Sequence, residues 1–399
     1  MALRIQIDRE DTTPLYQQIA GQLRNQISTG QLPNGTRLPP VRELANLLGV
    51  NRITAHNAYS ELQSGGWIES TVGKGTFVAS EVRPVALLET LGENAGASAV
   101  LNDILPIRQM PALRSLAYAE PDPAYAPVDE FWGMLNIVRR ERSSMLFYDN
   151  PQGDARLRIE LARFVGDRGI TAMPDDVMVT NGAMQMLSLA SRVLASPGDD
   201  VLVEQPTYLG VFHMMKMQGL NPISVPWDDE GPRLDVIEHA LKTRNPRYFY
   251  TVPYFNNPTG KAVSPTRRRE LLDLAARYRL RIIEDDVYGF FGYDGPPPHA
   301  LKADDPDDLI VYVSSFSKLV MPGLRVGWGI LPASMFNNVL SLRRSDDMYG
   351  PSWVQRALAY YIQLGRLKGH IKRVIGIYRE RRDAIVTALD RYMPPGVTW

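Results

Sequence analysis

Three short amphipathic helices are predicted near the start of the chain. Apolar residues recur there at helical spacing in three groups, which are Leu15, Ile19, Leu23 and Ile27, then Val41, Leu44, Ala45 and Leu48, then Ala55, Ala58, Tyr59 and Leu62. Gly49 marks the end of the second helix, and Asn51 can cap the third because its side chain accepts a hydrogen bond from the first turn. The stretch 67–78 predicts two short strands around a Gly-Lys-Gly tip.

The pattern changes after residue 113, where apolar runs alternate with helical segments. These runs are Val177–Val179, Val201–Val203, Tyr248–Thr251, Arg281–Ile283 and Leu309–Val313. Such alternation is typical of an α/β domain in which helices cover a mostly parallel sheet. Residues 81–112 lose the periodicity, and the stretch 92–98 is rich in small residues. We therefore expect a helical domain at 12–80, a linker at 81–112 and an α/β domain at 113–399.

The first predicted domain has the order of elements found in a winged helix-turn-helix. In that fold the third helix enters the DNA major groove with its N-terminal residues against the bases. Arg52 and His56 lie one turn apart and face outward, and Lys74 at the wing tip can reach a phosphate. Residues 1–80 hold seven Lys and Arg against six Asp and Glu, so a single copy attracts DNA only weakly. A dimer that presents two copies would bind more tightly.

Three segments resemble the DNA-binding domain of the GntR family, namely Leu38–Arg42, Leu48–Thr54 and Gly73–Val78. Pro40 departs from the serine that this family more often has. The resemblance implies double-stranded DNA as a partner and six contact residues, which are Arg42, Arg52, Thr54, His56, Gly73 and Lys74. A three-helix module that docks onto another protein is the alternative.

Composition narrows the remaining chemistry. The chain has no cysteine, which excludes disulfides, thiol catalysis and cysteine-bound zinc. The five histidines show no metal-ligand spacing, so we expect no metal site. The chain has 44 basic residues (Lys and Arg) and 44 acidic residues (Asp and Glu), so its formal net charge is zero. The whole chain therefore has no net attraction for polyanions. We find neither a signal-peptide pattern nor an apolar run of the roughly 18 residues that cross a membrane, and we expect a cytoplasmic protein.

A lysine among small hydroxyl residues follows the last of the predicted strands. Lys318 lies in the sequence Ser315-Phe316-Ser317-Lys318, and Arg325 follows it. A lysine amine can form an imine with an aldehyde cofactor, while hydroxyls and a guanidinium can hold a phosphate beside it. The segment resembles the Schiff-base lysine segment of fold-type I enzymes that use pyridoxal 5'-phosphate (PLP). The resemblance implies PLP as cofactor, Lys318 as the catalytic amine and Ser315, Ser317 and Arg325 as phosphate ligands.

An acid at a strand end can pair with the pyridine nitrogen of PLP and keep it protonated. Asp285 and Asp286 both follow a predicted buried strand, at the end where α/β sheets bind ligands. In the aminotransferase pattern a tyrosine follows this acid by three positions, and Tyr288 therefore favours Asp285. Asp286 remains the alternative. The resemblance implies that Tyr288 and Asn257 bind the phenolic oxygen of the cofactor.

Further segments match the same enzyme class. A helix that starts after Val179 offers free backbone N–H groups to a phosphate, and the resemblance assigns this role to Gly182, Ala183 and Met184. It also places the ring of Tyr208 on the pyridine face. Tyr148 matches the tyrosine that reaches the phosphate of the partner subunit, which implies a homodimer with shared sites.

The whole chain therefore resembles the MocR subfamily of GntR regulators, in which a winged helix is fused to an aminotransferase-like domain. The resemblance implies a head-to-tail homodimer that regulates transcription and senses PLP, or its adduct with an amino acid or amine. A catalytically active aminotransferase is the alternative. Many regulators of this subfamily have a His-Gln sequence where Asn256 and Asn257 stand, and the asparagine form is that of working aminotransferases.

Two features bear on catalysis. Ala119 stands where aminotransferases usually keep a glycine near the substrate, and its methyl group could crowd a bound amino acid. The usual arginine for the substrate carboxylate lies in a small domain that the last residues before Trp399 only begin to enter. We expect that domain to follow Trp399; the absence of the carboxylate clamp is the alternative.

Overall fold

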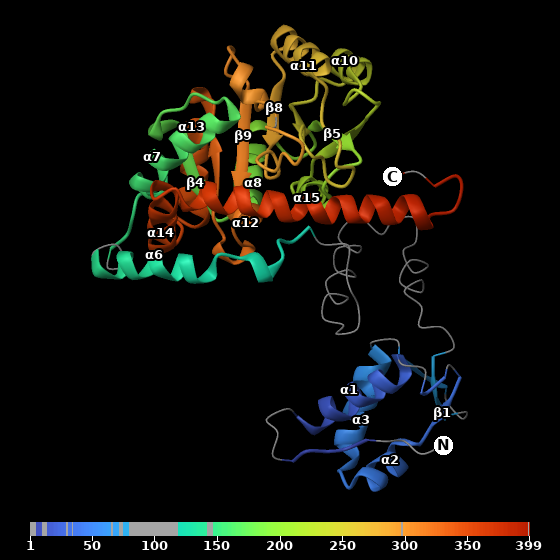
Figure 1. Ribbon diagram of the computed structural model, residues 1–399. Coiled ribbons are helices and arrows are strands. Elements are labelled where there is room, and N and C mark those ends of the chain that lie inside the picture. Colours follow the sequence, from blue (N-terminus) through green and yellow to red (C-terminus); the bar gives the residue numbers. More distant parts are fainter. Residues whose placement is uncertain are drawn as a thin grey trace. The chain divides into compact units, whose positions relative to one another are not determined.

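The computed structural model describes residues 5–9, 14–28, 31–33, 35–64, 67–71, 75–79, 119–141, 147–296, 298–397 and 399. The chain divides into two compact units, Met1–Ser115 and Leu116–Trp399 (Figure 1). Each unit has a hydrophobic core of its own. The linker predicted at 81–112 lies outside the described residues.

The described part of the first unit combines three helices with a small antiparallel sheet. The helices are α1 (Leu15–Ser28), α2 (Val41–Leu48) and α3 (Arg52–Ser64), and the strands are β1 (Arg37–Leu38), β2 (Ile68–Thr71) and β3 (Gly75–Val78) in the order β1-β3-β2. The predicted apolar stripes form its core, which includes the fully buried Ile19, Leu23, Leu44, Ala55 and Leu62. The three predicted helices and two wing strands are confirmed. With two residues, β1 is too short for a hydrophobic pattern to reveal it.

Caps fix the tight turn between α2 and α3. Gly49 follows α2 in a left-handed conformation with φ of 62°, and its backbone N–H bonds back to the last turn. The Asn51 side chain accepts a hydrogen bond from the Thr54 backbone N–H at 2.7 Å, as predicted for the start of α3. The helix-turn-helix geometry therefore follows from local sequence.

A seven-stranded sheet forms the centre of the second unit. Its order is β4-β10-β9-β8-β7-β5-β6, and its strands are β4 (Val177–Thr180), β5 (Asp200–Gln205), β6 (Asn221–Pro226), β7 (Tyr248–Thr251), β8 (Arg281–Asp285), β9 (Ile310–Ser315) and β10 (Gly327–Ile330). The adjacent strands β6, β5, β7, β8 and β9 pair in parallel, whereas β10 is antiparallel to both β9 and β4. The link between β9 and β10 is too short for a crossover helix, so the chain returns antiparallel. The predicted mostly parallel sheet is confirmed, while β6 and β10 were not predicted.

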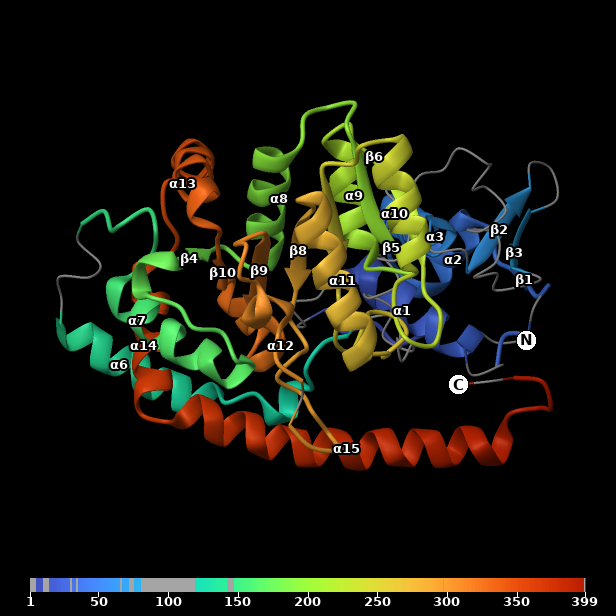
Figure 2. The same cartoon turned by 90° about the horizontal axis from the view of Figure 1, so that it is seen from above.

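Helices cover both faces of this sheet (Figures 1 and 2). The helices described in this unit are α6 (Val128–Glu141), α7 (Ala155–Phe164), α8 (Ala183–Leu194), α9 (Leu209–Met217), α10 (Leu234–Thr243), α11 (Pro265–Tyr278), α12 (Phe316–Leu319), α13 (Ala333–Asp346), α14 (Ser352–Gln363) and α15 (Arg366–Tyr392), and of these α6 and α15 pack against α14. Successive strand residues point to opposite faces, so Val177 and Val179 of β4 enter one core cluster and Met178 another. Short 3-10 turns connect several elements, at Pro123–Tyr125, Val165–Arg168, Pro174–Asp176, Leu301–Asp304 and Pro322–Leu324.

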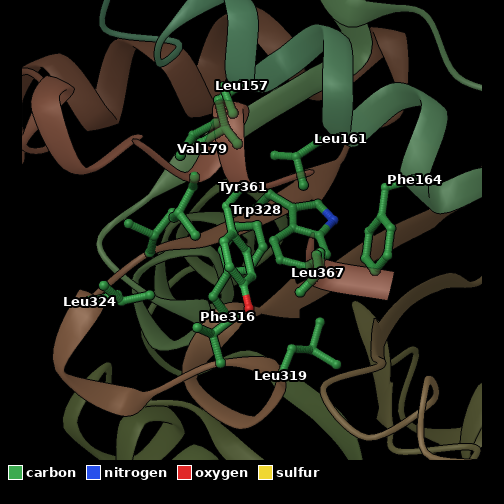
Figure 3. Packing of buried hydrophobic residues seen from close by; sticks show 14 of the residues in the cluster. Leu157, Leu161, Phe164, Val179, Phe316, Leu319, Leu324, Trp328, Tyr361 and Leu367 are labelled. Atoms are coloured by element: carbon green, nitrogen blue, oxygen red, sulfur yellow. The ribbon is translucent and has the colours of Figure 1, made fainter. Parts of the chain in front are cut away.

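Two buried side chains anchor the short helix α12, which directly follows β9. Phe316 and Leu319 are fully buried in the cluster shown in Figure 3, where the Phe316 and Trp328 rings lie 4.8 Å apart between centroids. Residues three apart share one side of a helix, so Ser317 and Lys318 face away from this core and stay partly exposed. Packing below α12 therefore sets where the lysine lies.

Replacing Leu319 with alanine should destabilise the second unit by about 2–5 kcal/mol, because it leaves a cavity directly beneath Lys318. Chemical denaturation of the full-length protein measures this change. The matched control is Met217→Ala, since Met217 on α9 is 73% exposed and should shift the transition by less than about 0.5 kcal/mol. A similar small effect in both variants would show that Leu319 does not anchor α12.

Candidate functional site

Three consecutive buried acids, Glu284, Asp285 and Asp286, mark the carboxyl end of β8. Side chains alternate along an extended chain, so Glu284 and Asp286 face one side and Asp285 faces the other. Glu284 accepts hydrogen bonds from the backbone N–H groups of Leu301 and Lys302 at 2.7 and 2.9 Å. The three acids therefore have different partners despite their adjacency.

Asp286 is engaged by a buried arginine. Arg168 Nε and Nη2 donate to its two carboxylate oxygens at 2.7 and 3.1 Å, and the Tyr312 hydroxyl donates to it at 2.9 Å. Gly289 allows this close approach, because a Cβ atom there would lie 1.9 Å from the Asp286 carboxylate. With its charge compensated and both oxygens bonded, Asp286 has a structural role, and Asp285 is the better candidate for a ligand.

Asp285 is buried but only half satisfied. Its Oδ2 accepts a hydrogen bond from the Tyr250 hydroxyl at 2.7 Å, while its Oδ1 has no hydrogen-bond partner within the described part of the chain. Burial raises the pKa of Asp285 to about 6, although the Tyr250 hydrogen bond opposes the rise. A buried acceptor without a donor costs free energy unless a bound group donates to it. The protonated ring nitrogen of PLP is such a donor, so this carboxylate fits that cofactor.

Lys318 lies on the open side of α12, and its Nζ donates to the Ala119 carbonyl at 2.5 Å. Burial lowers the pKa of Lys318, and the carboxylates of Glu120 and Asp285 oppose this shift. A lowered pKa raises the neutral fraction of the amine, which is the form that attacks an aldehyde. The backbone of Ala119, the residue whose methyl group was expected to crowd the substrate, thus holds the lysine amine.

Tyr288, Asn257 and Tyr208 lie around Asp285. Burial raises the pKa of Tyr288 to about 12, the charge of Asp285 adds to the rise, and a hydrogen bond with Asn257 opposes it. Burial also raises the pKa of Tyr208, again with Asp285 adding to the shift and with Arg325 opposing it. These mutual effects show that the side chains assigned to the ring and its phenolic oxygen gather at one place.

The start of α8 forms a cradle of backbone N–H groups. Gly182 caps this helix with φ of 88°, and a Cβ atom there would lie 2.7 Å from Arg325 Nη2, so only glycine fits. Ala183 and Met184 follow in the first turn, whose free N–H groups suit an anion. The antiparallel register places Gly327 between Thr180 and Ser315, and the Ser315 and Ser317 hydroxyls lie 2.9 Å apart. This end of the site fits a phosphate.

Tyr148 lies at the surface. Its side chain is 82% exposed, and its ring centroid lies 5.3 Å from that of Tyr349. A side chain this exposed does not line the buried site of its own chain. The structure therefore brings together the predicted cofactor residues around Lys318 but leaves Tyr148 outside that group.

The predicted DNA contacts lie on the first unit as far as the structure describes them. Arg42 on α2 and Arg52 and His56 on α3 are exposed, and Thr54 is half-buried. His56 Nδ1 lies 2.9 Å from the Ser60 hydroxyl, which steadies its ring. Gly73 and Lys74 lie outside the described residues.

Several contributing residues were not predicted from the sequence. Ile53 is 71% exposed at the start of α3, where an apolar side chain can contact a thymine methyl group. Arg168 and Tyr250 hold the two aspartates of β8. The sequence could have indicated Tyr250, because it is a tyrosine near the end of an apolar run. Nothing in the sequence indicated the role of Arg168.

Among the described residues, no helix combines the length and apolar character that a bilayer crossing requires. The same part of the chain holds no group of three or more His, Cys, Asp and Glu side chains placed to bind a metal ion.

Comparison with known proteins assigns both units. Residues 15–78 match the gntR family of bacterial regulatory proteins, and residues 118–398 match aminotransferase class I and II. The uncharacterized HTH-type transcriptional regulator YisV of Bacillus subtilis is 32% identical across 99% of this chain and 83% of its own length. The probable rhizopine catabolism regulatory protein MocR of Rhizobium meliloti is 27% identical across 98% of this chain and 80% of its own. This chain belongs to the MocR-type GntR regulators.

A solved structure supports the cofactor of this MocR-type chain. LysN, the α-aminoadipate aminotransferase of Thermus thermophilus, matches it with a TM-score of 0.66 and 30% identity over 70% of this chain and 71% of the other. That structure is complexed with N-(5'-phosphopyridoxyl)-L-leucine. A GntR-type DNA-binding domain is therefore joined here to a PLP-dependent aminotransferase-type domain.

The half-satisfied carboxylate predicts that Asp285→Asn stabilises the cofactor-free protein at neutral pH. The pKa of Asp285, about 6, lies above its ordinary value of 3.8, so the stability linked to this group is present below pH 3.8 and lost as pH rises through 6. Asparagine removes the buried charge and should raise the free energy of unfolding by roughly 2–3 kcal/mol at pH 7.5, with the gain vanishing near pH 4. Denaturant unfolding at the two pH values measures it.

Asp286→Asn is the matched control for this measurement. It leaves Arg168 buried without its counter-charge and should destabilise the protein by about 3–5 kcal/mol at neutral pH. If Asp285→Asn were instead destabilising at pH 7.5, the Oδ1 atom of Asp285 would have a donor, and the argument from this unpaired oxygen would be wrong.

Proposed function

We propose that this MocR-type regulator binds DNA through its first unit and senses an amino acid or amine through PLP at Lys318. The observation that carries the proposal is the pairing of a partly buried lysine of lowered pKa with a buried Asp285 oxygen that lacks a donor within the described ranges of the chain. In this proposal the winged helix spans 12–80, the linker 81–112 and the aminotransferase-type domain 113–399. The protein acts in the cytoplasm, where bacterial DNA lies.

When bound, PLP supplies an aldehyde that reacts with primary amines and a ring that withdraws electrons. Lys318 would hold the aldehyde carbon, Asp285 would keep the ring nitrogen protonated, and Tyr208 would lie against the ring face. Tyr288 and Asn257 would donate hydrogen bonds to the phenolic oxygen. The phosphate would be held by Gly182, Ala183, Met184, Ser315, Ser317 and Arg325.

The contact between Lys318 and Ala119 supports a sensing role. The Lys318 amine donates to the Ala119 carbonyl at 2.5 Å. A lysine bound to the aldehyde would give up this hydrogen bond, and an effector amine that displaced the lysine would restore it. A change of ligand at the site would therefore alter a backbone contact of the second unit.

DNA binding by this regulator uses the exposed side chains at the start of α3 and their neighbours. We assign Arg52, Thr54 and His56 to the major groove, with Arg42 on the backbone and Gly73 and Lys74 at the wing. The chain acts as a head-to-tail homodimer, which doubles the weak electrostatic attraction of one copy.

Exposed aromatic surface in the second unit supports the dimer. Phe147 and Tyr148 are 76% and 82% exposed, and the ring contact of Tyr148 with Tyr349 places them beside the 52% exposed Met348. Neighbouring exposed apolar side chains of this kind are typical of surfaces that another chain covers. A second copy of this chain would cover them and receive Tyr148 at its phosphate.

A working aminotransferase is the second candidate function. Asn257 contacts Tyr288, and Asp285 is placed to keep the ring nitrogen protonated, which is the requirement for removing a proton next to an amino group. The two functions share the first chemical event at Lys318. They differ in whether a 2-oxo acid is released.

The sensing proposal is tested by binding of the full-length protein to DNA from upstream of its own gene, with and without PLP and a panel of amino acids and amines. The wild-type protein should change its affinity for DNA with at least one of them. Lys318→Ala should lose borohydride-trapped cofactor and this response, while retaining DNA binding.

Lys261→Ala, at an exposed lysine, is the control and should keep the trapped cofactor and the response. Undiminished trapping in Lys318→Ala would reject the assignment of the lysine. A response that appears only in step with 2-oxo acid release would favour the aminotransferase.

The DNA assignment predicts that Arg52→Ala costs about 1–3 kcal/mol of specific binding if the guanidinium contacts a base. Lys74→Ala should instead weaken binding to all sequences alike. It should also lower the slope of log affinity against log salt concentration by about one, because one fewer phosphate contact releases one fewer counterion. Fluorescence anisotropy with specific and unrelated DNA at several salt concentrations separates the two effects. Arg279→Ala, at an exposed arginine of the second unit, is the control. Normal specific binding by both Arg52→Ala and Lys74→Ala would contradict the winged-helix interface.

A further inference from the structure

A half-buried polar cluster joins the start of α8 to the connection between α13 and α14. The Asp347 carboxylate accepts hydrogen bonds from Asn181 Nδ2 and, at 2.7 Å, from Gln185 Nε2. The Gln185 side chain in turn accepts a hydrogen bond from the Asn181 backbone N–H at 2.8 Å. Asn181 precedes Gly182, so Asp347 holds the turn from which the cradle of N–H groups begins.

The same turn is in contact with Arg325. Arg325 Nη2 donates to the Asn181 carbonyl at 3.3 Å and lies so close to Gly182 that a Cβ atom there would be 2.7 Å away. A shift of Asn181 would therefore move two things together, namely the direction of the first N–H groups of α8 and the position of the guanidinium. Both belong to the phosphate end of the site.

Arg343 explains why a carboxylate rather than a neutral side chain lies at this point. Its side chain is fully buried, and none of its three guanidinium nitrogens has a hydrogen-bond partner in the described part of the chain. Among the described residues, the carboxylate that forms an ion pair with Arg343 is that of Asp347, whose Oδ1 lies 3.6 Å from Arg343 Nε. The two charges compensate each other in a low-dielectric environment, which keeps Asp347 available as an acceptor for Asn181 and Gln185.

We propose that Asp347 is a positioning residue for the cofactor phosphate, acting through Asn181 on the N-terminus of α8 and on Arg325. The inference rests on the proposed cofactor site and adds to it a residue that touches no part of the cofactor. It also connects that site to the surface, because the Tyr349 backbone N–H donates to the Asp347 carbonyl at 2.6 Å and the Tyr349 ring packs on Tyr148. Asp347 thus lies between the phosphate cradle of its own chain and the tyrosine proposed to reach the partner.

The test compares PLP with pyridoxal, which lacks the phosphate, on the cofactor-free full-length protein. Absorbance of the lysine-bound ligand gives both dissociation constants. Asp347→Asn should weaken PLP by about tenfold or more, the size expected for a lost charge-assisted hydrogen bond, and leave pyridoxal within about twofold. Asn181→Ala should give the same result, because it removes the side chain that Asp347 holds and keeps the backbone carbonyl that Arg325 needs.

The ratio of the two affinities separates positioning from general loss of structure. A variant that is merely less stable should lose both ligands equally, and unfolding curves of the cofactor-free proteins record that loss independently. Asn181→Ala keeps the test valid if Asp347→Asn does not fold, since it leaves the charge pair of Arg343 and Asp347 intact.

Asp346→Asn is the matched control. Asp346 adjoins Asp347 but forms a partly exposed ion pair with Arg192 at 2.6 Å, and its replacement should change neither constant. Equal losses for both ligands, or no loss for PLP, in Asn181→Ala would overturn the role of Asp347. Wild-type protein that bound PLP no better than the Lys318→Ala variant would overturn the proposed cofactor site as well.

Discussion

The buried ion pair between Arg168 and Asp286 makes the rest of the cofactor site possible. Three acids lie buried in a row at the end of β8, and their charges would repel strongly in a low-dielectric interior. Arg168 neutralises one of them through two hydrogen bonds and lies 5.1 Å from the Tyr254 ring. With Asp286 compensated, Asp285 can be ionised on the opposite side of the strand and face Lys318.

Two buried polar atoms at or near the proposed cofactor site have no hydrogen-bond partner among the described residues, namely Asp285 Oδ1 and the hydroxyl of Thr207, which precedes Tyr208 in the chain. Such atoms cost free energy unless a bound group pairs with them, and a ligand that binds only the folded state stabilises it by mass action. Lys318 belongs to the same site, where its amine is held by the backbone carbonyl of Ala119.

The MocR-type arrangement places this chemistry on the same chain as a DNA-binding domain. The aminotransferase fold alone does not decide between sensing and catalysis. Both would begin when an amine competes with Lys318 for the cofactor aldehyde. The buried Asp285 carboxylate is compatible with either function. The distinction therefore rests on what happens after the effector binds. The contacts of Asp347 with Asn181 and Arg343 would extend the proposed phosphate site beyond the residues that touch the cofactor.

Local sequence determined most elements of both units, although β1, β6 and β10 escaped it, and it indicated the segment proposed to bind the cofactor. Helical spacing from Leu15 to Leu62, the cap at Asn51 and the run before Lys318 depend on residues a few positions apart, so the pattern contains the information. The spacing to Tyr288 favoured Asp285, but only the tertiary structure gave Asp286 its partner, since Arg168 and Asp286 are 118 positions apart. It alone also joined Asn181 to Asp347, 166 positions away. Contacts of this kind depend on how the strands and helices pack, and a charge in the sequence carries no mark of the distant partner that will compensate it.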